Sequence, residues 1–369
     1  MEKQVSQEQV SIISYFLIRS CFMGLAMEML VHIAKQDSIW GLLLGIAIGI
    51  IPFFLYNYLM NYREDFSIIE LNKHIFGNKW GKIINSIIIL FVFYLANIIF
   101  WNLLIFITSQ YLYQSPTIFV SVIFIIPIFY LLTKGLKGIG RVGIILFIFA
   151  MILYWISFFG LISQVAPYNF KPFLTNGLVP IINSGYHYFA FSTLLLFLIT
   201  IIPKNQIKEG KKIKLQKSWG IGLGIIHLFT FSALFFTIAV FGLKLTMLYQ
   251  YPEFHLLKRV SIAGFLERIE SFLSFRWIFD FFMSITFCLY FITEGIRRNF
   301  QIHSKKVILG LQITISLLLM FMANMTFTNS TTSNYFLTNY FPAFLVFFFL
   351  IIPSCTYFGI LKKKKGTTS

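Results

Sequence analysis

The sequence predicts an all-α integral membrane protein with ten transmembrane helices. Of its 369 residues, 58% are hydrophobic and only 12% are charged, and the mean hydropathy is +0.80. Soluble domains carry about 25% charged residues. The apolar residues also fall into runs of about 20, the length that a helix needs to cross a bilayer. A water-soluble fold is therefore excluded, and residues 1–369 are expected to form a single polytopic membrane domain.

The apolar runs and the basic residues between them define the predicted spans. In chain order, the spans are residues 10–34, 39–60, 82–113, 117–133, 142–165, 178–202, 219–245, 277–296, 307–325 and 340–361. With the N-terminus inside, 22 of the 30 Lys and Arg residues fall in inner segments. Cytoplasmic segments of membrane proteins carry this excess of positive charge. We therefore expect ten spans in a cell membrane, with both termini cytoplasmic.

Two spans contain residues that interrupt a plain apolar helix. The first span is interrupted by Arg19, Ser20, Cys21, Gly24 and Glu28. The sixth carries a cluster of helix-breaking and polar residues, namely Gly177, Pro180, Asn183, Ser184, Gly185, Ser192 and Thr193. Paired breaks in corresponding spans of two halves are a pointer to a transporter binding site. The alternative is that the small residues only let helices pack closely.

These breaks predict a ligand cavity near mid-membrane, between the first and sixth spans. The proposed lining residues are Cys21, Phe22, Gly24, Glu28, Asn183, Ser184, Gly185 and His187. Intramembrane charges are costly and usually functional, so Glu28 is a candidate pocket residue and Arg19 needs an acceptor. A packed, hydrogen-bonded histidine is the alternative for His187.

The longest outer segment, residues 246–276, has apolar residues at helical spacing and charged residues between them. This pattern predicts two short amphipathic helices lying at the outer surface. Periodicity alone does not separate such helices from solvated helices over the bundle.

The same segment carries a resemblance to a known family. Its run YPEFHLLKRVSIAGFLERIESFLSFRWIFDFF resembles the signature segment of the permease-like "B" subunits of spore nutrient-germinant receptors. The run from Gly177 to Ile182 and the pair Gln36-Asp37 followed by Trp40 are similar to further segments of that family.

The resemblance implies the amino acid–polyamine–organocation transporter fold. This fold has five plus five inverted helices, with the first and sixth unwound. It also implies binding of an L-amino acid or a similar small nutrient germinant. The implied location is the spore inner membrane, and the implied partners are a larger membrane "A" subunit and a lipoprotein "C" subunit.

Other function classes fit less well. A secondary amino-acid permease of the same superfamily is the main alternative. No catalytic or phosphate-binding motif is present, so no enzyme and no cofactor are expected. The three cysteines and six histidines show no metal-ligand spacing, so no metal site is expected. The basic residues that give the net charge of +17 lie beside helix ends, where anionic lipid headgroups of the bilayer attract them. Nucleic-acid binding is therefore not expected.

Overall fold

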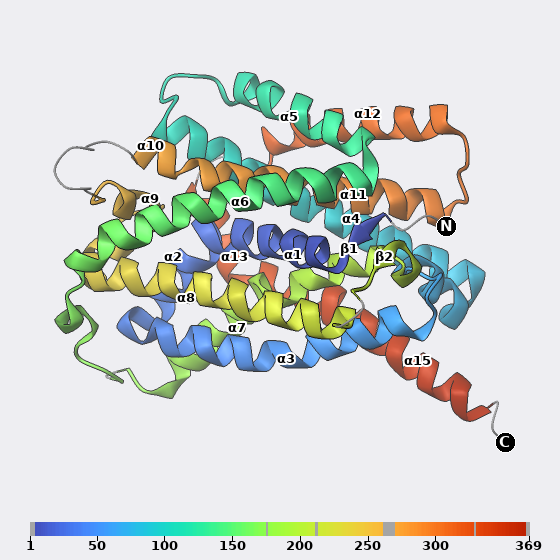
Figure 1. Ribbon diagram of the computed structural model, residues 1–369, viewed down its shortest axis with the longest axis horizontal. Coiled ribbons are helices and arrows are strands. Elements are labelled where there is room, and N and C mark those ends of the chain that lie inside the picture. The colour runs from blue at the N-terminus through green and yellow to red at the C-terminus, as the bar shows by residue number, and fades with distance from the viewer. Residues whose placement is uncertain (1–3, 175, 211–212, 261–269, 328–329, 367–369) are drawn as a thin grey trace.

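The computed structural model is a bundle of long helices that run along its longest axis (Figure 1). It describes residues 4–174, 176–210, 213–260, 270–327 and 330–366. Both chain ends and the pair of short strands lie toward one end of the bundle, and α9 and α10 lie toward the other (Figure 1).

The described residues form fifteen α-helices and two short strands. The helices are α1 Gln7–Cys21, α2 Met27–Ala34, α3 Ser38–Tyr62, α4 Ile68–Gln110, α5 Thr117–Thr133, α6 Gly135–Leu161, α7 Leu178–Phe191, α8 Leu215–Leu248, α9 Pro252–Leu257, α10 Glu270–Leu273, α11 Phe275–Asn299, α12 Lys305–Ala323, α13 Ser330–Asn339, α14 Phe341–Val346 and α15 Ile352–Gly366. The strands are β1 Val5–Ser6 and β2 Ile207–Lys208. Short 3₁₀ turns cover Lys35–Asp37, Ile162–Gln164, Pro167–Phe170, Thr193–Ile201 and Lys204–Gln206, and π-helical turns cover Phe22–Ala26 and Phe347–Ile351.

The prediction of a polytopic helical membrane protein is confirmed. Within the described ranges, eight helical segments are long and apolar enough to cross a membrane. The first of them, Gln7–Tyr62, includes α1, α2 and α3, and the apolar helix α5 is shorter than these eight. Helix α13 and the strand pair were not predicted from the sequence.

The strand pair ties the N-terminus to the segment that follows the sixth predicted span. β1 and β2 are parallel, with Val5 opposite Ile207. The backbone N–H of Gly210 donates to Oε1 of Gln7 at 3.1 Å. The structure thus places two segments that were both predicted to be cytoplasmic at the same end of the bundle.

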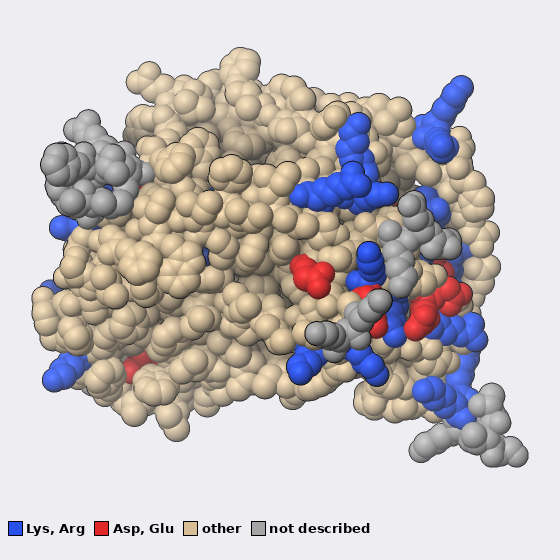
Figure 2. All heavy atoms as spheres, in the orientation of Figure 1, with Lys and Arg blue, Asp and Glu red and all other residues tan. Residues whose placement is uncertain are grey.

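Charged side chains are distributed unevenly over the surface. Figure 2 shows basic side chains gathered toward the end that holds the chain termini, and a broad surface without them across the middle of the same face. An uncharged middle zone suits contact with lipid, and basic residues at one end suit the cytoplasmic headgroup region.

Helix α3 packs closely on α7 because glycines line the contact. Gly41, Gly45 and Gly49 are spaced by four residues, so they share one face of α3. A Cβ atom at Gly41 would lie 2.5 Å from Oγ of Ser184, and one at Gly45 would lie 2.6 Å from the carbonyl oxygen of Gly185. Small residues permit this backbone approach between membrane helices.

Candidate functional site

The predicted break in the first span is confirmed. Helix α1 ends at Cys21 and α2 begins at Met27. Between them, Met23 has an extended ψ of 126° and Gly24 has a φ of 76°. A positive φ favours glycine, because glycine has no Cβ to clash with the backbone. The break therefore depends on Gly24, and it removes the Met23 carbonyl from the regular helical hydrogen-bond pattern.

Side chains from two other elements close over this break. Asn102 of α4 donates from Nδ2 to the carbonyl oxygen of Met23 at 3.3 Å. Tyr251, which precedes α9, donates from its hydroxyl to Oδ1 of Asn102 at 3.3 Å. A Cβ atom at Gly24 would lie only 2.8 Å from the Tyr251 ring and 3.0 Å from Asn102. Gly24 is thus required both for its φ and for the space it leaves.

A buried charge network adjoins the break. Nη2 of Arg19, in the last turn of α1, lies 2.9 and 3.2 Å from the two carboxylate oxygens of Glu253 in α9. Arg276 of α11 donates to the same carboxylate. Nε of Arg19 lies 3.9 Å from Oδ2 of Asp280. All four side chains are at most 5% exposed.

The network contains two guanidinium groups and two carboxyl groups, and Glu253 is the carboxyl group that both arginines contact. Burial alone would raise the pKa of Glu253, but the guanidinium groups of Arg19 and Arg276 outweigh burial and hold this pKa below its ordinary value. Glu253 is therefore an anion at neutral pH. The acceptor that the sequence required for Arg19 is Glu253, supplied from the outer segment.

The structure corrects the surface position expected for the first part of segment 246–276. Tyr251, Glu253 and Leu257 are all 2% exposed or less, so α9 is buried among the spans. Its one carboxylate, Glu253, does not face water, because it pairs with arginines of α1 and α11. Helical periodicity cannot separate a charge that faces solvent from one that faces a buried partner. Residues 261–269, which include Glu267 and Arg268, lie outside the described part of the chain.

The break in the sixth span lies later than predicted. Asn183, Ser184 and Gly185 belong to the regular helix α7, and the backbone departs from helical geometry at Ser192, with φ −119° and ψ −82°. The chain then continues as the 3₁₀ turn Thr193–Ile201. Ser184 and Gly185 do not face Cys21 to Gly24, because they pack on the glycines of α3. Asn183 is exposed. The contacts of Ser184 and Gly185 are those of the close-packing alternative.

Helix α7 approaches the first-span break through Tyr188. Its ring lies 5.9 Å from that of Phe22, centroid to centroid. Its hydroxyl lies 2.7 Å from Nδ1 of His227 and 2.8 Å from Oγ1 of Thr230. Sequence inspection missed Tyr188 as a site residue, although it belongs to the polar stretch that follows Gly185.

Glu28 lines a cavity of about 300 Å³ between α2 and α13. Asn334 of α13 donates to its carboxylate at 3.0 Å, and Nε2 of His32 lies 3.9 Å from the same oxygen. His187 also connects to α13. Its Nε2 lies 2.9 Å from the carbonyl oxygen of Thr338, which lines this cavity, and its Nδ1 lies 2.8 Å from that of Asn183. Helix α13 therefore connects His187 to the wall of the cavity that Glu28 lines.

The predicted residues thus fall into two groups. Cys21, Phe22 and Gly24 lie at or beside the packed break, and Glu28 lies about one helical turn beyond it, in the cavity wall. Asn102, Tyr251 and Glu253 were not predicted as site residues. In the sequence, Asn102 is a polar residue in an apolar span. That feature alone does not distinguish a pocket residue from a residue that links helices.

Comparisons with known proteins support one family. Residues 5–332 match the sequence profile of the spore germination permease family, described as "Spore germination protein". Spore germination protein KB of Bacillus subtilis (strain 168) is 25% identical over 279 residues, which cover 73% of this chain and 72% of that protein. Spore germination protein GerQB of Bacillus cereus is 24% identical over 338 residues, 88% of each chain. Spore germination protein A2 of Bacillus subtilis (strain 168) is 25% identical over 268 residues, 71% of this chain and 72% of that protein.

Proposed function

Because this chain belongs to the spore germination permease family, we propose that it is the permease-like subunit of a germinant receptor, and that it binds a small nutrient of the L-amino acid class. The observation that carries the ligand proposal is the break at Met23 and Gly24, about one helical turn before Glu28 and its cavity. Binding of the nutrient would trigger germination of the spore.

The chemistry of this region suits a zwitterion. The Glu28 carboxylate offers a negative charge to an ammonium group. Helix α2 begins at Met27, so the positive end of its dipole lies beside the break and would favour a carboxylate there. We place Cys21, Phe22, Gly24 and Glu28 in the proposed site, with His187 as a support for its α13 wall. We assign Asn183, Ser184 and Gly185 to the α7 scaffold instead.

Tyr251 and α9 would act as the cover of this site. Tyr251 lies directly against Gly24, and Glu253 is held by Arg19 at the end of α1. A ligand that approaches the break from the α9 end would have to displace Tyr251. The arrangement thus supports a closed state in which the site is covered by the protein's own chain.

We further propose ten spans with both termini in the cytoplasm, in the spore inner membrane. In this topology the segment Gln7–Tyr62 crosses twice, with a reversal at Lys35, whose φ is 53°. Helix α5 is then the tenth crossing segment. The broken first and sixth spans, five apart in order, support a five-plus-five inverted repeat, as does the extensive packing of α4 on α11. The proposed partners are a larger membrane "A" subunit and a lipoprotein "C" subunit.

Spores that carry Glu28→Gln test the ligand site. We expect a strongly reduced germination response to a mixture of the standard L-amino acids, with the protein present in membranes at its normal level. Asp65→Asn, a matched change of an exposed carboxylate in the α3–α4 loop, should leave the response unchanged. A normal response in the Glu28→Gln spores would exclude this cavity as the nutrient site. Uptake of the same labelled amino acids by vesicles would favour the secondary permease.

A further inference from the structure

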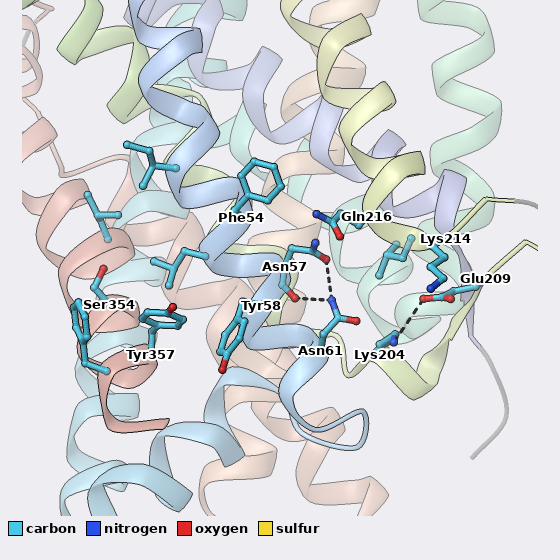
Figure 3. A pocket seen from close by; sticks show the side chains of 15 residues that line it. Phe54, Asn57, Tyr58, Asn61, Lys204, Glu209, Lys214, Gln216, Ser354 and Tyr357 are labelled. Carbon is cyan, nitrogen blue, oxygen red and sulfur yellow. Dashed lines mark hydrogen bonds and ion pairs between the residues drawn. The ribbon is translucent and has the colours of Figure 1, made fainter. Parts of the chain in front are cut away.

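A second, larger cavity lies at the end of the bundle that holds the chain termini. It has a volume of about 820 Å³ and is bounded by α3, by Lys204, Glu209 and residues 214–216, and by α15 with the turn before it. Figure 3 shows its side chains pointing inward from these three elements. Neither Glu28 nor the residues at the first-span break line it.

The lining of this cavity changes character along α3. Ile51, Phe54 and Leu55 form an apolar wall, and Ile51 and Phe54 are 69% and 53% exposed. One to two turns further on, Asn57 and Asn61 form a polar wall, in which Nδ2 of Asn61 donates to Oδ1 of Asn57 at 3.0 Å. A groove that is apolar toward mid-bundle and polar toward its end matches a molecule with a polar head and apolar chains.

The polar part of the groove contains a lysine that has no ion pair with any described residue. Lys204 and Lys214 line it, together with one carboxylate, Glu209. Nζ of Lys204 lies 3.0 Å from Glu64 and 3.9 Å from Glu209, so its charge is largely compensated. Lys214 is exposed and has no ion pair with any residue that the structure describes. It therefore offers its charge to an anion in the groove.

Aromatic side chains mark the rim. Tyr58 and Tyr357 meet edge to face at 4.8 Å, and Nζ of Lys364 lies 5.5 Å from the centroid of the Tyr58 ring. Tyrosine and lysine are the residues that gather at the membrane–water boundary. The polar part of the groove is thus at the depth of lipid headgroups.

We propose that this groove binds an anionic phospholipid of the cytoplasmic leaflet. The phosphate would lie near Lys214 and the Asn57–Asn61 pair, and an acyl chain would run along Ile51 and Phe54. Basic pockets between membrane helices on the cytoplasmic side bind such headgroups. This inference depends on the membrane orientation proposed above, but not on the identity of the nutrient.

Native mass spectrometry of the full-length protein in detergent tests the proposal. The probes are phosphatidylglycerol, phosphatidylcholine with the same acyl chains, and glycerol phosphate without chains. Only phosphatidylglycerol should be retained and should raise the melting temperature. Equal retention of phosphatidylcholine, or equally tight binding of glycerol phosphate, would overturn the anionic-lipid assignment.

Variants with matched controls locate the bound lipid. Lys214→Gln should weaken retention of phosphatidylglycerol about tenfold, the effect of losing one hydrogen bond to a charged group. Lys217→Gln, an exposed lysine outside the lining, should not. Ser354→Trp should fill the groove. Cys355→Trp, at a neighbouring exposed residue that does not line the groove, should not. Unchanged retention in Lys214→Gln, or the same loss in both lysine variants, would refute this site.

Discussion

Replacing Glu253 by glutamine is the most direct test of how α9 is held against the broken first helix. In the native protein this carboxylate is bonded to Arg19 at 2.9 Å and to Arg276, and all three side chains are at most 5% exposed. Two opposite charges at this distance attract by about 6 kcal/mol at an effective dielectric constant of about 20. The substitution would leave two buried guanidinium groups facing one carboxylate, Asp280, at 3.9 Å from the nearer one.

Breaking a buried ion pair by removing one partner costs about 3–5 kcal/mol. Because α9 is a short helix between two connecting segments, it can leave the bundle without unfolding the spans. We therefore expect local opening of residues 251–257, including Tyr251 over the break. A cost of at least about 3 kcal/mol corresponds to an increase of about a hundredfold in amide hydrogen exchange there.

Hydrogen-exchange mass spectrometry of the purified protein in nanodiscs measures this opening. Glu270→Gln, a partly exposed carboxylate at the same end of the bundle, is the matched control and should change exchange little. A double variant, Glu253→Leu with Arg276→Leu, removes one charge of each sign. It should open α9 less than Glu253→Gln does, because Arg19 then faces Asp280 alone. Native exchange rates at 251–257 in Glu253→Gln would refute the idea that the ion pairs hold α9.

Three further outcomes follow from the same contacts. Gly24→Ala should abolish the germination response, because it strains a φ of 76° and places a Cβ 2.8 Å from Tyr251; a normal response in spores would show that the break tolerates a side chain. Burial, with a smaller effect of Lys258, lowers the pKa of His255 to about 4 from 6.5. The folded state thus favours neutral His255, so the stability of the α9 region should fall as pH drops from 6.5 toward 4. His255→Gln should remove this pH dependence of hydrogen exchange in α9. If the pH dependence persists in the variant, another group causes it. Cysteine at Lys258 should react with an impermeant thiol reagent in intact cells and cysteine at Lys217 should not; the reverse pattern would invert the proposed topology.

Much of the architecture could be predicted from the sequence, because lipid restricts what a spanning segment can be. A backbone in hydrocarbon must satisfy its own hydrogen bonds, so about 20 apolar residues imply a helix. The fourth predicted span, 117–133, has the bounds of α5, and the sixth, 178–202, has nearly those of α7 with the following 3₁₀ turn. The first-span break was also predictable, since Gly24 and nearby polar residues interrupt an otherwise apolar run.

The break in the sixth span shows where composition stops being informative. Ser184 and Gly185 have the residue types of a helix break, but they serve the contact with Gly41 and Gly45. Small residues relieve crowding wherever a neighbouring backbone comes close, and only the position of that neighbour says which role they have. The actual departure from helical geometry, at Ser192, carries a weaker local signal than the cluster before it.

By itself, the sequence determined the membrane class, most of the spans, the first-span break and the family resemblance, since these depend on local composition and order along the chain. Only the tertiary structure decided that α9 is buried, that Arg19 meets Glu253, and that Tyr251 and Asn102 close over Gly24. Those contacts join residues more than seventy positions apart. The packing of whole helices determines which partner a charged or polar side chain contacts. Residue spacing along one helix does not predict which helix packs against it.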